Sequence, residues 1–113
     1  MLTTTTVDSR QLYDDQRVKM RVDTIQLGDR PIMQRGVIEQ SNSVVVVPVT
    51  EDGSILLVKQ WRHAVQSTLL EAPAGHINSG EDPREAAARE LQEEAGHKAK
   101  SLFHLPGFWA APS

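Results

Sequence analysis

The stretch GHINSGEDPREAAARELQEEAGH, residues 75–97, determines most of what can be predicted about this chain. It opens with a glycine-containing loop and continues into a run rich in alanine and glutamate. Asp82 is suited to the N-cap of a helix and Pro83 to its first helical position. Gly96 suits the left-handed residue that commonly ends a helix. The spacing therefore predicts a helix from about Pro83 to Ala95.

Three glutamates gather on this expected helix. Glu90 and Glu94 are four residues apart and share a face, and Glu93 flanks them. Glutamate-rich helices are usually solvated surfaces, and the run RELQEE alone favours that interpretation. The longer pattern favours a metal site instead, because carboxylates are the ligands that Mg²⁺ takes together with substrate phosphates. We expect Mg²⁺ as the cofactor, with Mn²⁺ as the alternative.

Composition restricts the class of protein. The chain has 113 residues, enough for a single domain with a modest core. Its net charge of −3 gives no electrostatic reason to expect nucleic acid or an anionic membrane as a partner. Neither a membrane-spanning run nor the apolar core of a signal peptide is found in the sequence. A chain without cysteine fits a reducing compartment, and we expect a cytoplasmic location.

Strand patterns precede the expected helix. Alternating or β-branched residues occur at 18–27, 32–38, 43–50, 54–61 and 69–72. The run SVVVVPVT at 43–50 is expected to be buried on both faces of a sheet. One more strand is expected at 99–104, whereas the polar residues 1–15 are expected to be mobile unless a partner orders them. This order of elements predicts an α+β fold.

At residues 75–97 the chain resembles the Nudix hydrolase family, whose signature is G-x5-E-x7-R-E-U-x-E-E-x-G-U, where U is a bulky aliphatic residue. The sequence matches this pattern from Gly75 to Gly96. His97 departs from it, and we expect the difference to affect packing after the helix. The resemblance implies an α/β/α sandwich with a mixed sheet.

The resemblance also implies an extent for the domain. Residues 16–113 would form the Nudix domain, which in this family normally continues with further strands, a loop that often carries another acidic residue, and a C-terminal helix. We therefore expect a domain that is truncated at its C-terminal end. Exposed sheet edges and apolar surface recruit other chains. We expect a homodimer with residues 16–40 at the contact, because the family members that this chain most resembles commonly form dimers through their N-terminal strands.

Segments outside the signature resemble the ADP-ribose and ADP-sugar pyrophosphatase branch of the family. The segment QWRHAV at 60–65 is similar to a Q-aromatic-R motif of that branch, and LEAPAG at 70–75 is similar to its L-E-x-P-A-G motif. Pro112 stands near the place of a marker proline. The branch has a nucleoside diphosphate sugar as its substrate.

Three residues would contact that substrate if the resemblance holds. Arg62 would place a fork of N–H donors on a phosphate, although an ordinary surface cation is the alternative. Glu71 would help to hold the substrate or a water near the metal. Gly75 would allow the backbone to approach the ligand closely.

The resemblance implies a metal site made by Glu90 and Glu94 with the backbone carbonyl of Ala74. Glu93 would be a further ligand or a bridge between two metals, and it is also a candidate general base. Arg89 would orient the glutamates rather than touch the substrate. Together Glu90, Glu93, Glu94 and Arg89 form the expected catalytic group.

The implied reaction is metal-dependent hydrolysis of the diphosphate bond in a nucleoside diphosphate derivative. ADP-ribose or another ADP-sugar is the expected substrate, which gives AMP and a sugar phosphate. One alternative is a Nudix hydrolase that acts on NADH or on nucleoside triphosphates. The other is a non-catalytic nucleotide-binding or interaction module that retains the signature.

Overall fold

The computed structural model describes residues 3–111 and divides into two compact units, residues 1–41 and 42–113. In chain order the elements are β1 (Thr4–Asp14), β2 (Val18–Leu27), β3 (Met33–Gln40), β4 (Ser43–Val45), β5 (Val58–Arg62), the 3₁₀ turn η1 (His63–Val65), β6 (Ser67–Glu71), β7 (Ala74–His76) and α1 (Pro83–Ala95). Strands with one helix make an α+β fold, as the sequence predicts. Pro112 lies outside the described residues.

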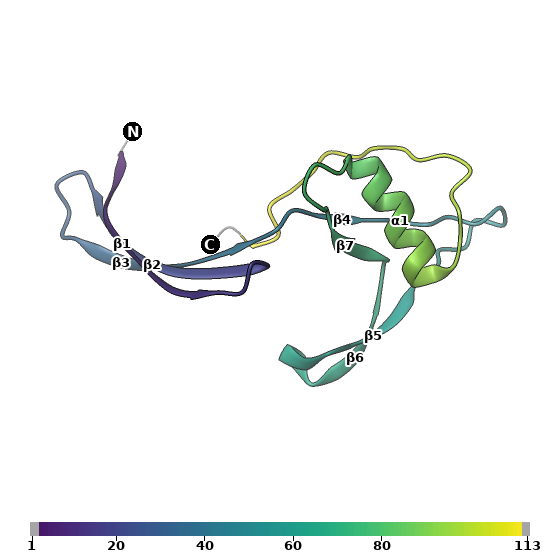
Figure 1. Cartoon of the computed structure of the whole chain (residues 1–113), viewed down its shortest axis with the longest axis horizontal. Helices are drawn as coiled ribbons and strands as arrows, with labels where there is room; N and C mark the ends of the chain where they lie inside the picture. Colours follow the sequence, from purple (N-terminus) through teal and green to yellow (C-terminus); the bar gives the residue numbers. More distant parts are fainter. Residues whose placement is uncertain (1–2, 112–113) are drawn as a thin grey trace. The chain divides into compact units, whose positions relative to one another are not determined.

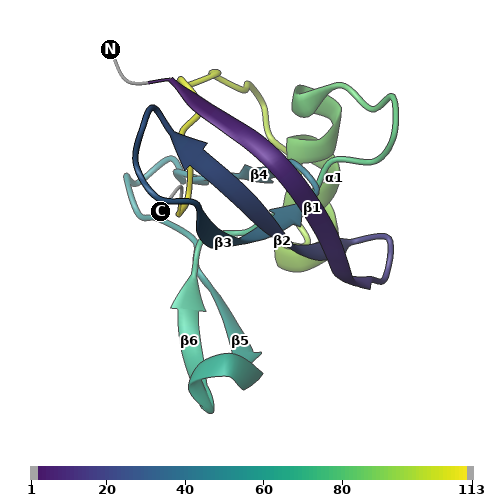
Figure 2. The ribbon, with the colours of Figure 1, turned by 90° about the vertical axis from the view of Figure 1, so that its left-hand side faces the viewer.

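The first unit is a three-stranded antiparallel sheet in which β2 lies between β1 and β3 (Figure 2). Within the segment 1–15, which was expected to be mobile unless a partner orders it, residues 4–14 form β1. Backbone pairing explains the difference, because β1 pairs with β2 from Thr4–Leu27 to Asp14–Lys19. Polar composition hid this strand, although the repeated threonines of this segment have high β propensity.

The second unit contains α1, which lies alongside β4 and β7 (Figure 1). The helix has the predicted bounds, and its ends have the predicted caps. The Asp82 carboxylate accepts a hydrogen bond from the backbone N–H of Arg84 at 2.8 Å. Gly96 adopts φ 70° and donates its N–H to the carbonyl of Gln92 at 3.0 Å. None of the described residues forms a helix long and apolar enough to cross a membrane.

A small apolar core joins the helix to its sheet. Ala86 and Leu91 on α1 are buried, and so are Val46 and Pro73. The N–H of Val46 donates to the carbonyl of Pro73 at 2.8 Å and extends the pairing of β4 with β7 by one residue. These contacts hold the start of the signature loop, at β7, against the middle of α1.

Two strand expectations are wrong. The run 43–50 was expected to be one strand buried on both faces, but β4 ends at Val45, and Val46 alone among the valines of this run is buried. Val45, Val47 and Val49 are each more than half exposed, and the paired residues of β4 and β7 end at Val45–Ala74. Residues 99–104 form no strand, and no described strand pairs with them.

The remaining strands, β5 and β6, form an antiparallel hairpin closed by η1. The pairs Val58–Glu71 and Gln60–Leu69 fix its register. Because side chains alternate along a strand, Gln60, Arg62 and Glu71 share one face of the hairpin. Every strand pair among the described residues is antiparallel, whereas the family resemblance implies a mixed sheet.

Candidate active site

Gly75 lies where the backbone of β7 meets the side chain of Glu90. A Cβ atom at position 75 would overlap all three carboxyl atoms of Glu90. Glu90 is buried, and its carboxylate accepts a hydrogen bond from Nη1 of Arg89 at 2.6 Å. The glycine of the signature is therefore needed because only a residue without a side chain leaves room for this carboxylate.

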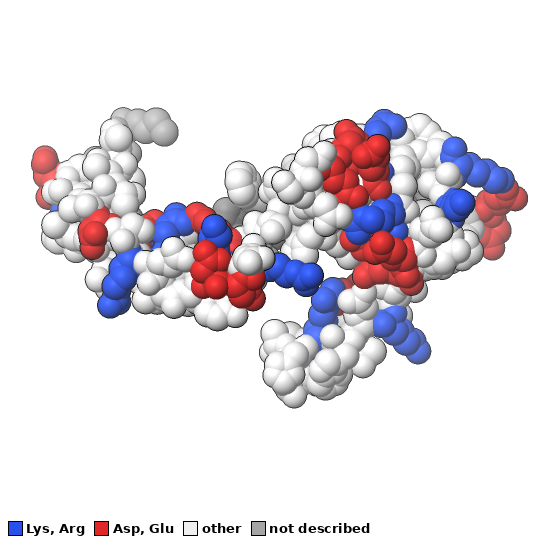
Figure 3. Space-filling view, viewed as in Figure 1, with Lys and Arg blue, Asp and Glu red and all other residues white. Residues whose placement is uncertain are grey.

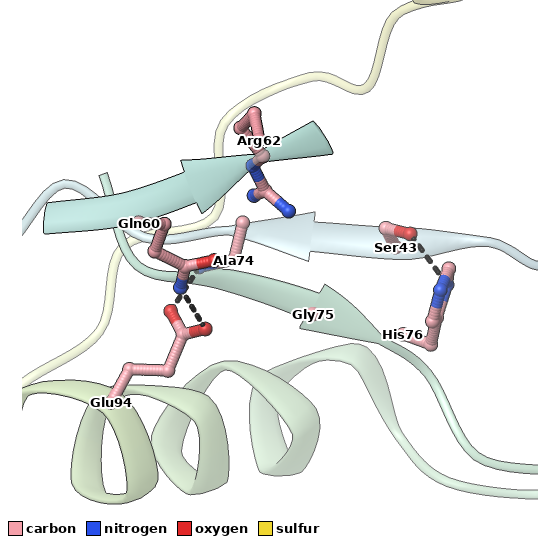
Figure 4. A pocket seen from close by; sticks show the side chains of 7 residues that line it. All are labelled: Ser43, Gln60, Arg62, Ala74, Gly75, His76 and Glu94. Atoms are coloured by element: carbon pink, nitrogen blue, oxygen red, sulfur yellow. Dashed lines mark hydrogen bonds between the residues drawn. The ribbon is translucent and has the colours of Figure 1, made fainter. Parts of the chain in front are cut away.

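Glu94 is fixed one turn further along the same face of α1. Its Oε2 accepts a hydrogen bond from the backbone N–H of Ala74 at 2.9 Å. Its Oε1 accepts one from Nε2 of Gln60 at 2.7 Å (Figure 4). Both oxygens of this carboxylate are thus oriented by donors from two different strands.

The backbone of Ala74 points toward the helix rather than toward β4. Pairs of an antiparallel ladder alternate between hydrogen-bonded and non-hydrogen-bonded. Since Val46 and Pro73 make a ladder bond, the next pair, Val45–Ala74, is a non-hydrogen-bonded one. The N–H of Ala74 accordingly reaches Glu94, and its carbonyl lies on the same edge of β7.

Arg89 is the centre of an ion-pair network. Its Nε and Nη2 donate to the two oxygens of Glu81 at 2.8 and 2.9 Å. Nη1 donates to Glu90 at 2.6 Å and lies 3.5 Å from Glu93, and Nη2 also donates to the carbonyl of His76 at 2.9 Å. One guanidinium therefore joins the signature loop, β7 and α1, and Figure 3 shows acidic and basic groups interleaved over this region.

The network shifts the acidity of its members. Hydrogen bonds from Arg89, and then one from the N–H of Asn78, lower the pKa of Glu81 from 4.5 to about 2. The hydrogen bonds to Glu81 and then Glu90 raise the pKa of Arg89. Both groups are therefore held in their charged forms at neutral pH.

The hairpin contributes a second ion pair. Nε of Arg62 donates to Oε1 of Glu71 at 2.8 Å, and Nη2 donates to the other carboxylate oxygen. This bond to Arg62 is the main cause that lowers the pKa of Glu71, and the bond to Glu71 raises the pKa of Arg62. Two of the five N–H groups of Arg62 serve this pair. The same side chain also lines a pocket.

The pocket lies between the hairpin, β7 and the end of α1, and has a volume of about 330 Å³. Its lining residues are Ser43, Gln60, Arg62, Ala74, Gly75, His76 and Glu94 (Figure 4). Arg62 points into it from β5 (Figure 4). The lining combines a carboxylate, a guanidinium, an amide, a hydroxyl and an imidazole with backbone groups, which suits a charged, polar ligand.

The structure brings together most of the residues expected from the sequence. Glu90 lies against Gly75, and Glu94 accepts a hydrogen bond from Ala74, so both contact β7. Glu93 is placed differently, since its side chain is 59% exposed on the outer side of the network. Arg62 and Glu71 share the hairpin face but bind each other.

Three lining residues were assigned no role from the sequence. Gln60 has a signal that could have revealed it, because it stands two residues before Arg62 and must share its face of the strand. Ser43 and His76 are opposite each other in the β4–β7 ladder, with Oγ and Nδ1 3.1 Å apart. Only the strand register, which is not visible in the sequence, brings this last pair together.

The donor set fits a hard divalent cation in its chemistry. Carboxylate and carbonyl oxygens are present at Glu90, Glu94 and Ala74, and the missing side chain of Gly75 makes room for the Glu90 carboxylate among them. Among residues 3–111 no three acidic, histidine or cysteine side chains converge closely enough to hold a metal as they stand. The reason is that the carboxylates of Glu90 and Glu94 are each turned toward protein donors.

Comparison with known proteins agrees with this geometry. The model of the NUDIX domain family matches residues 40–111. An ADP-ribose pyrophosphatase of Bacillus subtilis is 33% identical over 107 residues, which cover 95% of this chain and 58% of the relative. A methanol dehydrogenase activator of Bacillus methanolicus is 32% identical over 107 residues, with the same 95% and 58% coverage.

A solved structure described as an ADP compounds hydrolase has the same fold. Its TM-score is 0.85 at 24% identity, and the match covers 96% of this chain and 60% of that one. The chain thus spans about three fifths of the length of these relatives. The match of the family model over most of the second unit, together with the signature at Gly75–Gly96, shows that this chain belongs to the NUDIX domain family.

Proposed function

We propose that this chain hydrolyses the diphosphate bond of ADP-ribose or another ADP-sugar in a metal-dependent reaction, with Mg²⁺ as the cofactor. Water is consumed, and for ADP-ribose the products are AMP and ribose 5-phosphate. The observation that carries the proposal is the pocket in which Glu94 and Arg62 face the same space beside Gly75. A relative named ADP-ribose pyrophosphatase supports the same substrate class.

The residues have separate roles in this proposal. Glu90 and Glu94, with the carbonyl of Ala74, hold the cation, and Glu93 supplies a further ligand from the exposed side of the helix. A bound divalent cation neutralises diphosphate charge and makes a nearby water more acidic. Arg89 orients Glu90 through its hydrogen bond to the carboxylate, without reaching the substrate.

The hairpin supplies the contacts to the substrate. Arg62 retains N–H groups beyond those that bind Glu71, and these donate to phosphate oxygens. Glu71 holds the guanidinium in a fixed orientation through two parallel hydrogen bonds. This pre-organisation reduces the side-chain entropy that is lost when the substrate binds.

A substrate panel tests the proposal. The purified chain with Mg²⁺ is offered ADP-ribose, an ADP-sugar, NADH, ATP and dGTP, and released products are separated by chromatography. We expect the highest kcat/KM for ADP-ribose or the ADP-sugar. A higher kcat/KM for NADH or a triphosphate would refute the substrate class, and no turnover of any compound would favour a non-catalytic nucleotide-binding module.

We also propose that the protein acts as a cytoplasmic homodimer, with residues 16–40 at the contact. Strand β3 is one edge of the first sheet, and exposed edges favour pairing with another chain. The apolar side chain of Ile38 on β3 is exposed, and so is that of Ile32 just before this strand. Light scattering at micromolar concentration is expected to give the mass of a dimer, and a monomer with full activity would contradict the proposal.

A further inference from the structure

We propose that Gln60 is a positioning residue that holds Glu94 in the orientation needed for metal binding. This inference rests on the function proposed above and deepens it, because it concerns the same site. Nε2 of Gln60 lies 2.7 Å from Oε1 of Glu94, although the two residues are 34 positions apart in the chain. No part of the NUDIX signature includes Gln60, since the signature begins at Gly75.

The chemistry of the two groups fixes the direction of this hydrogen bond. An ionised carboxylate only accepts hydrogen bonds, so the group of Gln60 that faces it must be the NH₂. The other oxygen of Glu94 accepts the N–H of Ala74 at 2.9 Å. The two donors approach from β5 and from β7, and together they set both the position and the plane of the carboxylate.

Each bond leaves Glu94 able to bind a cation. A carboxylate has about four lone-pair sites on its two oxygens, and the two protein donors use one on each oxygen. Outer hydrogen bonds of this kind orient metal-binding side chains, and their loss typically lowers metal affinity about 10- to 100-fold. Gln60 has this relation to Glu94, and the backbone N–H of Ala74 is the second donor.

Gln60 also links the two halves of the pocket. It shares its face of β5 with Arg62, whose guanidinium is held by Glu71. A change at residue 60 therefore acts on the carboxylate side of the pocket through Glu94 while the Arg62–Glu71 pair stays in place. Because the Arg62–Glu71 pair is not disturbed, substitution of Gln60 should lower kcat for ADP-ribose and change KM little.

Two substitutions test the inference in the full chain. Gln60→Met keeps the length of the side chain without a donor, and Gln60→Asn keeps the amide but is one methylene too short to reach Glu94. Gln92→Met and Gln92→Asn are the matched controls, because Gln92 is an exposed residue of α1 that lies outside the pocket. Mn²⁺ affinity is measured by electron paramagnetic resonance without substrate, well below the Tm of each variant.

We expect both Gln60 variants to bind Mn²⁺ at least about 10-fold more weakly and both Gln92 variants to match the unaltered chain. A purely structural role would lower the Tm of the metal-free protein and leave the Mn²⁺ affinity of the folded protein unchanged, and that result overturns the inference. If only one Gln60 variant folds, the affinity of that variant decides.

The same measurements separate this inference from the proposed function. If the unaltered chain binds Mn²⁺ and hydrolyses none of the panel, but Gln60→Met weakens binding, the positioning role stands and the hydrolase proposal fails. If ADP-ribose is cleaved and Gln60→Met has unchanged Mn²⁺ affinity and kcat, the hydrolase proposal stands and the role of Gln60 is refuted. A chain that binds no Mn²⁺ overturns both.

Discussion

The carboxylate of Glu90 occupies the space that a side chain at Gly75 would fill. This relationship connects the first residue of the signature to a glutamate fifteen positions later. Gly75 has no positive φ angle, so its backbone conformation does not require glycine. Glycine is needed there because a larger residue would overlap Glu90. A buried carboxylate in this position needs a partner, and Arg89 supplies it at 2.6 Å.

Gly75→Ala should displace Glu90 because the added Cβ overlaps its carboxyl group. We expect Mn²⁺ affinity to fall at least about 10-fold and the Tm to fall as Glu90 loses its position beside Arg89. Gly36→Ala is the control, since no atom lies within 4 Å of a Cβ at that strand position. Calorimetry and metal titration measure both effects, and unchanged metal affinity in the Gly75→Ala variant would show that Glu90 is not a ligand.

The helix of the signature was predictable because its signals are local. Asp82, Pro83 and Gly96 act within one turn of the ends they define, so the bounds 83–95 follow from the sequence alone. The common face of Glu90 and Glu94 was predictable for the same reason, since residues four apart share a helical face whatever surrounds them.

The strands were predicted less well because their limits depend on partners distant in sequence. β4 ends at Val45 although four valines follow one another, since beyond it only the hydrogen bond from Val46 to Pro73 continues the pairing with β7. β1 forms from a polar segment because β2 pairs with it along most of its length. The contact of Gln60 with Glu94 and the pairing of Arg62 with Glu71 likewise depend on the positions of β5 and β6.

Glu94→Gln should abolish metal-dependent hydrolysis and leave the fold intact. The amide has nearly the same shape, but it lacks the charge of the ligand and turns an NH₂ group toward one of the donors from Gln60 and Ala74. We expect kcat/KM for ADP-ribose to fall by more than about 100-fold, beyond the loss typical of an outer hydrogen bond. Glu85→Gln on the exposed side of α1 is the control, and unchanged turnover in Glu94→Gln would refute the metal site.

Arg62→Lys should weaken substrate binding more than it slows chemistry. Lysine keeps the positive charge but lacks the fork of donors that can bind Glu71 and a phosphate at once. We expect KM for ADP-ribose to rise about 10-fold, which corresponds to one lost charge-assisted hydrogen bond. Arg84→Lys, the same change at an exposed helix position, is the control and should leave KM unaltered. Steady-state kinetics measure KM for both variants. A normal KM in Arg62→Lys would exclude Arg62 from the substrate site.

The ion pair of Glu81 with Arg89 should make folding sensitive to acid. The pKa of Glu81 in the folded protein is about 2, below its ordinary value of 4.5, so between these values the unfolded chain binds more protons than the folded one. The stabilisation from this group is therefore complete above about pH 4.5 and is lost as the pH falls toward 2.

Urea unfolding at about pH 7 and about pH 3 measures this contribution. The unaltered chain should be more stable than Glu81→Gln at the higher pH, and the difference should shrink at the lower one because protonation removes the same charge that the substitution removes. Glu85→Gln, which changes an exposed carboxylate in the first turn of the same helix, gives the reference for a group outside the network. A stability difference between the unaltered chain and Glu81→Gln that is equal at both pH values would mean that Arg89 does not hold Glu81 ionised in solution.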